Sequence, residues 1–459
     1  MVRSGRQTRI NMKPNASSLF SAVALFGAMS LSACSAESID GSVRLRIDLD
    51  RAVLPAESSG RAIIKICLDG VRRPRHDVRP PVNLALVIDR SGSMGGEKLE
   101  KAKEAAREML RHLSSDDIFS LVAFESGVQT LIGAQPVGDG RAIERAIDSI
   151  VAGGSTALFA GVSQGASEVR EYIESGRYVN RIVLLSDGIA NVGPSSPEEL
   201  GRLGAALVKE GISVTTVGLG LGYNEDLMTQ LAQRSDGNTY FVESSGDLPR
   251  IFAAELGDVL NVVARRVVVE IEFPVGVRPL NFIGREGVIR GQKAELTLNQ
   301  LYGGQEKFAL VEAEVTPPES GTESEIARAR VSYDDTLTQR NITLTATRLA
   351  KFSRTRQVVI DSADRQVQAD YARNVIAVTK DRAVELVDSG RKDEAANEMR
   401  RKAAELQQMA QTYGNTSVLS AAAAMPAEAE KIEQEGLDNA ARKTYRAESA
   451  QTKNQQSSK

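Results

Sequence analysis

Two kinds of hydrophobic pattern alternate along this chain of 459 residues. Around residues 42–80, and again around 262–348, apolar residues alternate with charged residues along the chain, as in Val43-Arg44-Leu45-Arg46-Ile47. A period of two predicts strands that bury one face. Between about 81 and 256, the apolar residues instead form short unbroken runs separated by helical stretches. Strands without alternation are buried on both faces, so this segment is predicted to be a largely parallel sheet covered by helices.

The inner segment is thus predicted to be an α/β domain. Its expected strands are 84–88, 118–124, 182–185 and 214–219, and its expected helices are 98–113, 158–174, 197–210 and 225–234. A lone pair of strands at 42–80 could not bury its own apolar face. We therefore predict that 42–80 and 262–348 form one all-β, sandwich-like domain, with the α/β domain of residues 81–256 inserted between them.

Helical periodicity dominates the remaining part of the chain. Residues 355–447 are predicted to be a helical region, in which 370–389 and 392–412 form a hairpin around Gly390. The end of the chain, residues 448–459, is polar and is predicted to be disordered.

The first residues have the pattern of a targeting segment. Four basic residues precede an apolar run at 19–31, and the run ends in Leu31-Ser32-Ala33-Cys34. The run is too short to span a bilayer comfortably, and small residues precede the cysteine as a signal peptidase requires. This segment resembles a bacterial lipoprotein signal. The resemblance implies removal of residues 1–33, attachment of lipid (palmitate among its acyl chains) to Cys34, and a tether of residues 34–41. An ordinary cleaved signal with an incidental cysteine is the alternative.

The same resemblance places the protein in the bacterial cell envelope, anchored to an extracytoplasmic membrane face. Ser35, and not Asp, follows Cys34. By analogy with enterobacterial sorting, this favours the outer membrane or cell surface over the cytoplasmic membrane. No later run reaches 18 apolar residues, so no transmembrane helix or pore is expected. Cys67 is left without a disulfide partner, and its strand-like surroundings favour a buried small hydrophobe over a reactive thiol.

Composition excludes several classes of function. A net charge of −3 argues against nucleic acid, because no basic excess is present to neutralise phosphates. Only two histidines occur, which weakens any mechanism that needs a histidine base or a histidine-rich zinc site.

Oxygen-bearing side chains gather at the predicted ends of strands. They are Asp89, Ser91, Ser93, Thr156 and Asp187. The first three directly follow strand 84–88, Asp187 ends the strand that begins at 182, and Thr156 lies in a glycine-rich stretch. In an open parallel sheet, ligands collect beyond the carboxyl ends of the strands. Hydroxyl and carboxylate oxygens are hard donors, which suit Mg²⁺, Mn²⁺ or Ca²⁺.

With this pattern, residues 81–256 resemble a von Willebrand factor type A domain. The resemblance implies a Rossmann-like fold and a metal-ion-dependent adhesion site of the form Asp-x-Ser-x-Ser, then Thr, then Asp, which the five residues match in order. It further implies that both serines, and often the threonine, touch the metal, whereas the two aspartates act largely through water. The remaining coordination position is then filled by an acidic side chain of a protein partner.

The flanking β and helical parts resemble bacterial envelope proteins named after calcium-activated chloride channels, although no pore segment is present here. The expected function is divalent-cation-dependent protein binding, as an adhesion or scaffold protein that captures an Asp or Glu of a partner. No enzymatic activity and no small-molecule substrate are expected. The alternative is a structural or assembly component of the envelope in which the metal site is regulatory. Capping of the following helices would be a purely structural role for Asp89 and Asp187.

Hydrolase chemistry is a remote alternative. Residues 161–165 match the nucleophile-elbow pattern around Ser163, but they fall within a predicted helix, and no histidine follows residue 112. A metal-dependent phosphatase-like enzyme would use Asp89 as nucleophile and would need a second Asp two residues later, where Ser91 stands. The sequence Gly218-Leu219-Gly220-Leu221-Gly222 is interpreted as a tight strand-to-helix loop and not as a dinucleotide fingerprint.

Overall fold

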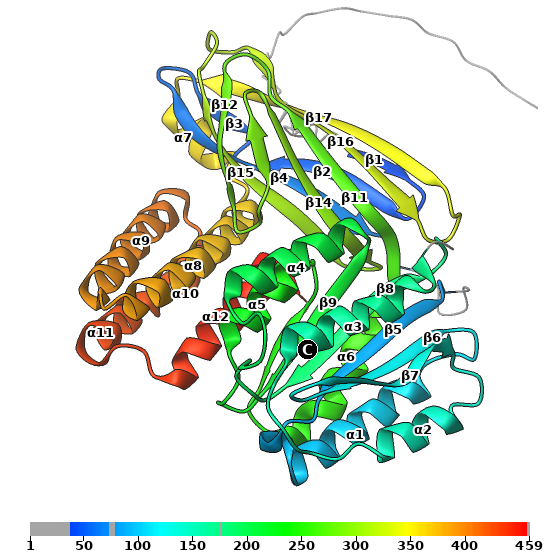
Figure 1. Ribbon diagram of the computed structural model, residues 1–459. Coiled ribbons are helices and arrows are strands. Elements are labelled where there is room, and N and C mark those ends of the chain that lie inside the picture. The colour runs from blue at the N-terminus through cyan, green and yellow to red at the C-terminus, as the bar shows by residue number, and fades with distance from the viewer. Residues whose placement is uncertain (1–36, 73–78, 174–175, 457–459) are drawn as a thin grey trace, which may run out of the picture. The chain divides into compact units, whose positions relative to one another are not determined.

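The structure is a computed structural model that describes residues 37–72, 79–173 and 176–456 (Figure 1). The predicted signal segment and Cys34 lie outside the described residues. The chain forms an α/β domain inserted in a β-sandwich, followed by a helical region, so the predicted fold class is confirmed.

The α/β domain is built on a sheet of six strands in the order β10-β9-β8-β5-β6-β7. The strands are β5 (Val82–Asp89), β6 (Ile118–Phe124), β7 (Val128–Pro136), β8 (Val179–Ser186), β9 (Ile212–Leu219) and β10 (Thr239–Val242). All neighbours are parallel except β7, which pairs antiparallel with β6 at one edge. The carboxyl ends of β5, β8 and β9 therefore meet at one edge of the sheet.

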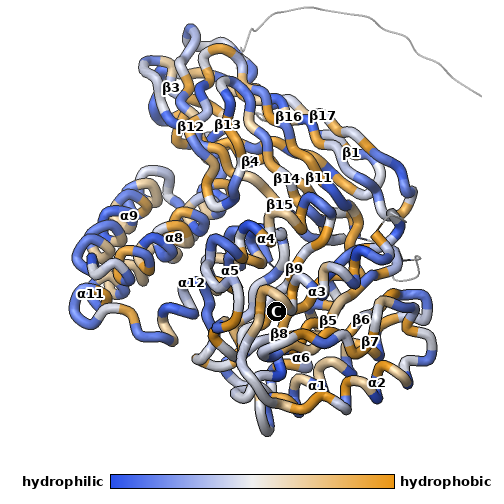
Figure 2. Tube along the Cα trace, viewed as in Figure 1, coloured by the Kyte–Doolittle hydropathy of each residue, from blue (hydrophilic) through white to orange (hydrophobic). Residues whose placement is uncertain are grey.

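Helices cover both faces of this sheet. One face packs against α1 (Glu97–Arg111), α2 (Arg141–Asp148) and α6 (Leu248–Val259), and the other against α3 (Leu158–Arg170), α4 (Pro197–Lys209) and α5 (Glu225–Arg234). Successive residues of β5 feed the two cores in turn, with Leu84 and Leu86 on one side and Ala85 and Val87 on the other. Figure 2 shows that hydrophobic residues lie along these inner strands. The unbroken apolar run of β5 thus reflects burial on both faces.

The sandwich has two sheets, in the orders β1-β2-β4-β15-β12 and β13-β14-β11-β16-β17-β3. The strands before the insertion are β1 (Glu37–Asp40), β2 (Val43–Leu49), β3 (Val53–Pro55) and β4 (Gly60–Gly70). Those after it are β11 (Val262–Glu272), β12 (Val277–Ile283), β13 (Val288–Arg290), β14 (Lys293–Tyr302), β15 (Glu306–Val315), β16 (Glu323–Asp335) and β17 (Asn341–Ser353). One core lies between the sheets and draws on strands from both sides of the insertion.

The two halves of the sandwich are joined by hydrogen-bonded ladders. β4 lies between β2 and β15 and pairs antiparallel with both. The tether predicted for residues 34–41 is wrong over residues 37–40, because these residues form β1 and pair with β2. Gly41, with φ of +59°, makes the tight turn between them, a conformation that suits glycine.

The helical region contains α7 (Arg356–Asp361), α8 (Arg365–Asp388), α9 (Lys392–Tyr413), α10 (Thr416–Ala422), α11 (Met425–Glu435) and α12 (Asn439–Lys453). The predicted hairpin is present as α8 and α9, with Gly390 in the turn at φ of +75°. Among the helices that the structure describes, none combines the length and the hydrophobicity that crossing a bilayer requires.

The prediction that residues 448–459 are disordered is wrong over residues 448–456. α12 continues to Lys453 and packs against α5. The side chain of Asn454 donates to the carbonyl of Gly237 at 3.0 Å, and the side-chain oxygen of Gln456 accepts from the backbone N–H of Thr239 at 3.0 Å. Polar residues of this segment are therefore paired with the α/β domain and, through Lys453 and Asp381, with α8, so their polarity does not indicate disorder.

Candidate metal centre

The predicted donors come together at the carboxyl edge of the α/β sheet. Ser93 donates through Oγ to Oδ1 of Asp187 at 2.7 Å, and the Oγ atoms of Ser91 and Ser93 are 3.1 Å apart. Asp89 ends β5 and accepts from the backbone N–H of Ser91 through Oδ1 at 2.8 Å. This local bond turns the chain sharply after β5, so that both serine hydroxyls face the end of β8. The loop between β5 and α1 is thereby shaped by the carboxylate that it carries.

Thr156 reaches the same place from the loop before α3. A Cβ atom placed on Gly188 would lie 2.9 Å from Oγ1 of Thr156 and 3.5 Å from Oδ2 of Asp89. Both oxygens therefore border the backbone that directly follows Asp187. Because Gly188 has no side chain, this space stays open. A larger residue directly after Asp187 would crowd the hydroxyl of Thr156.

Backbone hydrogen bonds join the loops that carry these donors. The N–H of Gly153 donates to the carbonyl of Arg90 at 2.8 Å, and the N–H of Gly92 donates to the carbonyl of Gly154 at 3.1 Å. Asn191 accepts from the N–H of Thr156 through its side chain at 2.9 Å. These bonds, together with the one from Thr156 to Asn191, tie the donor-bearing loops to one another.

Burial and charge make the centre electrostatically unbalanced. Asp89, Ser91, Thr156 and Asp187 are buried, whereas Ser93 is exposed, so the set opens to solvent on one side. Burial raises the pKa of Asp89, and the nearby charge of Asp187 adds to this rise, while hydrogen bonds from Ser186 and Ser91 oppose it. Two acidic groups that share a desolvated place favour a bound cation.

A lysine supplies part of the missing positive charge. The ammonium group of Lys98, in the first turn of α1, pairs with Oδ2 of Asp187. The side chain of Asp187 is fully buried, whereas that of Lys98 is 40% exposed. Among the described residues, Asp89 has no such ion pair, and its carboxylate accepts from the hydroxyl of Ser186 at 2.5 Å. One ammonium thus compensates one of the two carboxylates.

Three contributors were not predicted from the sequence: Lys98, Ser186 and Asn191. Ser186 and Asn191 flank Asp187 closely in the chain, so polar residues at the end of a buried strand could have indicated them. Lys98 lies nine residues beyond Asp89 on a helix, and nothing in its local pattern indicates that it pairs with Asp187. Only the meeting of β5 and β8 brings these groups together.

The donor chemistry fits a hard divalent cation. The set consists of hydroxyl and carboxylate oxygens, which Mg²⁺, Mn²⁺ and Ca²⁺ prefer. Within the described ranges, no group of three or more His, Cys, Asp or Glu side chains could hold a metal ion. The candidate site described above draws on three hydroxyl oxygens beside its two carboxylates.

Two further sequence motifs have structural roles. Ser163 lies within α3 and not on a strand-to-helix turn, so residues 161–165 do not form a nucleophile elbow. Residues 218–222 end β9 and lead into α5, as expected for a tight loop. A Cβ atom on Gly222 would lie 3.0 Å from the carbonyl oxygen of Asp187, so this loop borders the metal centre.

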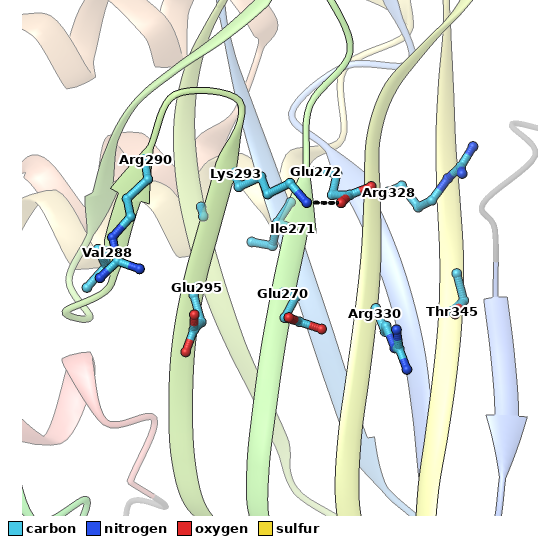
Figure 3. Close-up of a pocket in the computed structure, with 11 residues that line it drawn as sticks. Glu270, Ile271, Glu272, Val288, Arg290, Lys293, Glu295, Arg328, Arg330 and Thr345 are labelled. Carbon is cyan, nitrogen blue, oxygen red and sulfur yellow. Dashed lines mark hydrogen bonds and ion pairs between the residues drawn. The ribbon is translucent and has the colours of Figure 1, made fainter.

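A hollow of about 390 Å³ on the outer face of the sandwich is lined mainly by charged side chains (Figure 3). Glu270 faces Glu295 on one neighbouring strand and Arg330 on the other. Lys293 pairs with Glu272 at 2.7 Å. Charges of both signs are mixed on this face and remain exposed, which is the pattern of a solvated sheet face and not of a site with converging donors.

Comparison with known proteins agrees with this geometry. Residues 83–254 match the sequence model of the von Willebrand factor type A domain. The protein sll0103 of Synechocystis sp. is 34% identical over 177 residues, which cover 39% of this chain and 41% of that protein. The chain thus spans about two fifths of the length of this relative.

Two solved structures share the fold over most of the chain. A von Willebrand factor type A protein from Catenulispora acidiphila superposes with a TM-score of 0.62 at 15% identity, covering 81% of this chain and 88% of that one. The ArnB paralog VWA2 from Sulfolobus acidocaldarius gives 0.60 at 18% identity, covering 90% and 98%. At these identities the likeness concerns the fold alone. Together with the family match, it shows that the α/β insertion of this chain is a von Willebrand factor type A domain.

Proposed function

We propose that this protein binds other proteins in a divalent-cation-dependent manner through the von Willebrand factor type A domain. The observation that carries the proposal is the convergence of three hydroxyls and two buried carboxylates at one sheet edge that is open beside Ser93. The family match supports a metal-dependent protein interaction as the general role. The acidic nature of the partner group is our further proposal.

The residues of the chain have distinct parts in this proposal. The hydroxyls of Ser91, Ser93 and Thr156 would hold the cation directly, and Asp89 and Asp187 would support it through water and hydrogen bonds. When bound, such a cation supplies a Lewis-acidic centre that keeps most of its positive charge, because few carboxylates neutralise it. Ser93 stands on the open side, where a carboxylate of the partner can approach. Each charge-assisted contact of this kind contributes about 1.5–3 kcal/mol.

Binding is proposed in preference to catalysis. Ser91 occupies the position where an aspartyl-phosphate enzyme needs an acid/base carboxylate, so Asp89 lacks a partner for proton transfer. A structural role in the envelope, with the metal regulatory, is the second candidate, and the large sandwich and helical parts favour it. The two candidates differ in whether partner capture depends on the metal.

Replacing Asp89 by alanine should remove most of the affinity for Mg²⁺ and Mn²⁺, because it deletes one of the two buried charges and the bond that shapes the serine loop. Isothermal titration calorimetry on the purified chain measures this. Asp139→Ala is a matched control, since Asp139 is an exposed carboxylate of the same domain. Unchanged affinity in Asp89→Ala would refute the site assignment. Capture of a partner that persists undiminished in EDTA would favour the structural role instead.

We also propose that Cys34 carries lipid and anchors the protein to an extracytoplasmic membrane face. The basic first residues, the short apolar run and the sequence Leu31-Ser32-Ala33-Cys34 support this. In a Cys34→Ala variant, the protein should leave the membrane fraction and lose radiolabelled palmitate. Cys67→Ala is the control, because Cys67 is the other cysteine of the chain and is buried in β4. A Cys34→Ala variant that still fractionates with membranes would show that another segment is the anchor.

A further inference from the structure

Large apolar side chains are exposed at one place in the von Willebrand factor type A domain. Val151, Ile189 and Leu221 have relative exposures of 72%, 61% and 50%. In the described residues from β5 to α6, no other large hydrophobic side chain is exposed. Scattered single exposed hydrophobes are ordinary on protein surfaces, but their confinement to one edge of a domain indicates an interaction surface.

All three side chains lie on the loops that build the metal centre. Ile189 follows Asp187 by two residues, and Val151 precedes the glycine-rich loop of Thr156. Leu221 stands beside Gly222, whose added Cβ would lie 3.0 Å from the carbonyl oxygen of Asp187. The apolar side chains therefore come from three loops, which follow β8, precede α3 and follow β9.

Two basic side chains lie at the same edge, each beside a carboxylate. Lys98 is 40% exposed beside Asp187, and Arg90 follows Asp89 directly. The guanidinium group of Arg90 lies 3.8 Å from the carboxylate of Glu125, which partly compensates the charge of Arg90. A bound divalent cation would shift the net charge of this edge from negative to positive. A ligand that fits this edge has one negative group at its middle and apolar groups around it.

We propose that Val151, Ile189 and Leu221, called here the apolar rim, contact a segment of a partner protein in which an Asp or Glu is flanked by aliphatic or aromatic residues. This proposal rests on the proposed function and specifies its partner. Apolar contacts around a central carboxylate exclude water, and exclusion of water strengthens the electrostatic contact that it surrounds. A purely acidic segment would bury charged neighbours against the rim and so would bind less well.

The test is a selection of random displayed peptides on the full chain in Mg²⁺, followed by elution with EDTA. Enriched peptides should carry Asp or Glu directly beside Leu, Ile, Val or Phe. A synthetic peptide from this selection should bind the double variant Ile189→Ser/Leu221→Ser at least about tenfold more weakly than the original chain. The affinity for Mg²⁺ alone, measured by calorimetry, should stay the same, because neither side chain is a donor. Val275→Ser is the control, since Val275 is 99% exposed but lies in the sandwich.

The possible failures are distinguishable. Enriched peptides with acidic clusters and no apolar neighbours would overturn the rim proposal while leaving the metal site intact. Equal peptide affinity in the double variant would do the same. If the chain alone forms a dimer in Mg²⁺ that the double variant does not form, the rim is a self-association surface, and the partner assignment is wrong. If the original chain binds no Mg²⁺ by calorimetry, the proposed function itself fails.

Discussion

Replacing Arg181 by methionine is expected to lower the free energy of unfolding by about 3–5 kcal/mol, because it leaves a buried carboxylate without its counter-charge. Arg181 is fully buried at the start of β8 and donates to Gln300 at 2.7 Å and to Tyr302 at 2.6 Å, both in β14 of the sandwich. Its guanidinium also lies 3.6 Å from Glu255 in α6. Burial alone lowers the pKa of Arg181, but Tyr302 and Glu255 raise it above its ordinary value, so the group stays charged.

Urea unfolding of the purified chain at neutral pH measures this loss. Arg170→Met is the control: Arg170 pairs with Glu210 at the surface, where an ion pair contributes up to about 1 kcal/mol. Adding Glu255→Gln to Arg181→Met should recover part of the loss, since the uncompensated charge is then removed. A loss below about 1 kcal/mol in Arg181→Met would mean that the hydrogen bonds from Arg181 to Gln300 and Tyr302 contribute little to holding the two domains together.

Replacing Glu225 by alanine is expected to lower the free energy of unfolding by about 3 kcal/mol and to loosen α12. Glu225, in the first turn of α5, pairs with both Arg442 and Lys443 of α12. Lys443 is buried, donates to the carbonyl of Tyr223 at 2.6 Å and lies 4.4 Å from the centre of its ring. Without Glu225, this ammonium keeps a single neutral acceptor in a desolvated place.

Hydrogen exchange of the amides of α12, together with urea unfolding, measures the effect. Glu198→Ala is a matched control, because Glu198 is an exposed glutamate in the first turn of α4 and its loss should cost no more than about 1 kcal/mol. If the amides of α12 exchange equally slowly in Glu225→Ala and in the original chain, α12 is held mainly by its apolar contacts.

The inner strands of the α/β domain could be predicted because their burial is visible in local composition. β5, β6, β8 and β9 are short apolar runs buried on both faces, and such runs are typical of inner strands of a sheet covered by helices. β7 was not predicted. It is an edge strand with mixed exposure, so its residues show neither a clear run nor a clear alternation. α6 was also missed, although residues 243–247, which are polar or glycine, separate its largely apolar sequence from β10.

The last helix shows where local composition misleads. α12 is rich in polar and charged residues, which is why the sequence predicts that its last turn belongs to a disordered tail. Its charges are instead paired with acidic groups far away in the sequence, as Arg446 is with Asp226 and Asp381. The local sequence around α12 does not show which distant acidic residues will pair with its basic side chains.

The candidate site also has parts that the sequence could predict and parts that it could not. The grouping of the five candidate side chains could be predicted, because each stands at or just after the end of a predicted strand or in a glycine-rich loop. Their supports could not. The pairing of Lys98 with Asp187, and of Ser186 with Asp89, depends on which strands are neighbours in the sheet. Strand order is a property of the whole fold.

The insertion of the von Willebrand factor type A domain has a mechanical consequence. Its two chain connections enter the sandwich through β4 and β11, which are inner strands of different sheets. β4 is bonded to β2 and β15, and β11 is bonded to β14 and β16. If the proposed partner binds at the candidate metal centre, tension on that partner is shared between the two sheets. Pulling out either strand requires the ladders on both of its sides to shear together, whereas an edge strand would peel away one bond at a time.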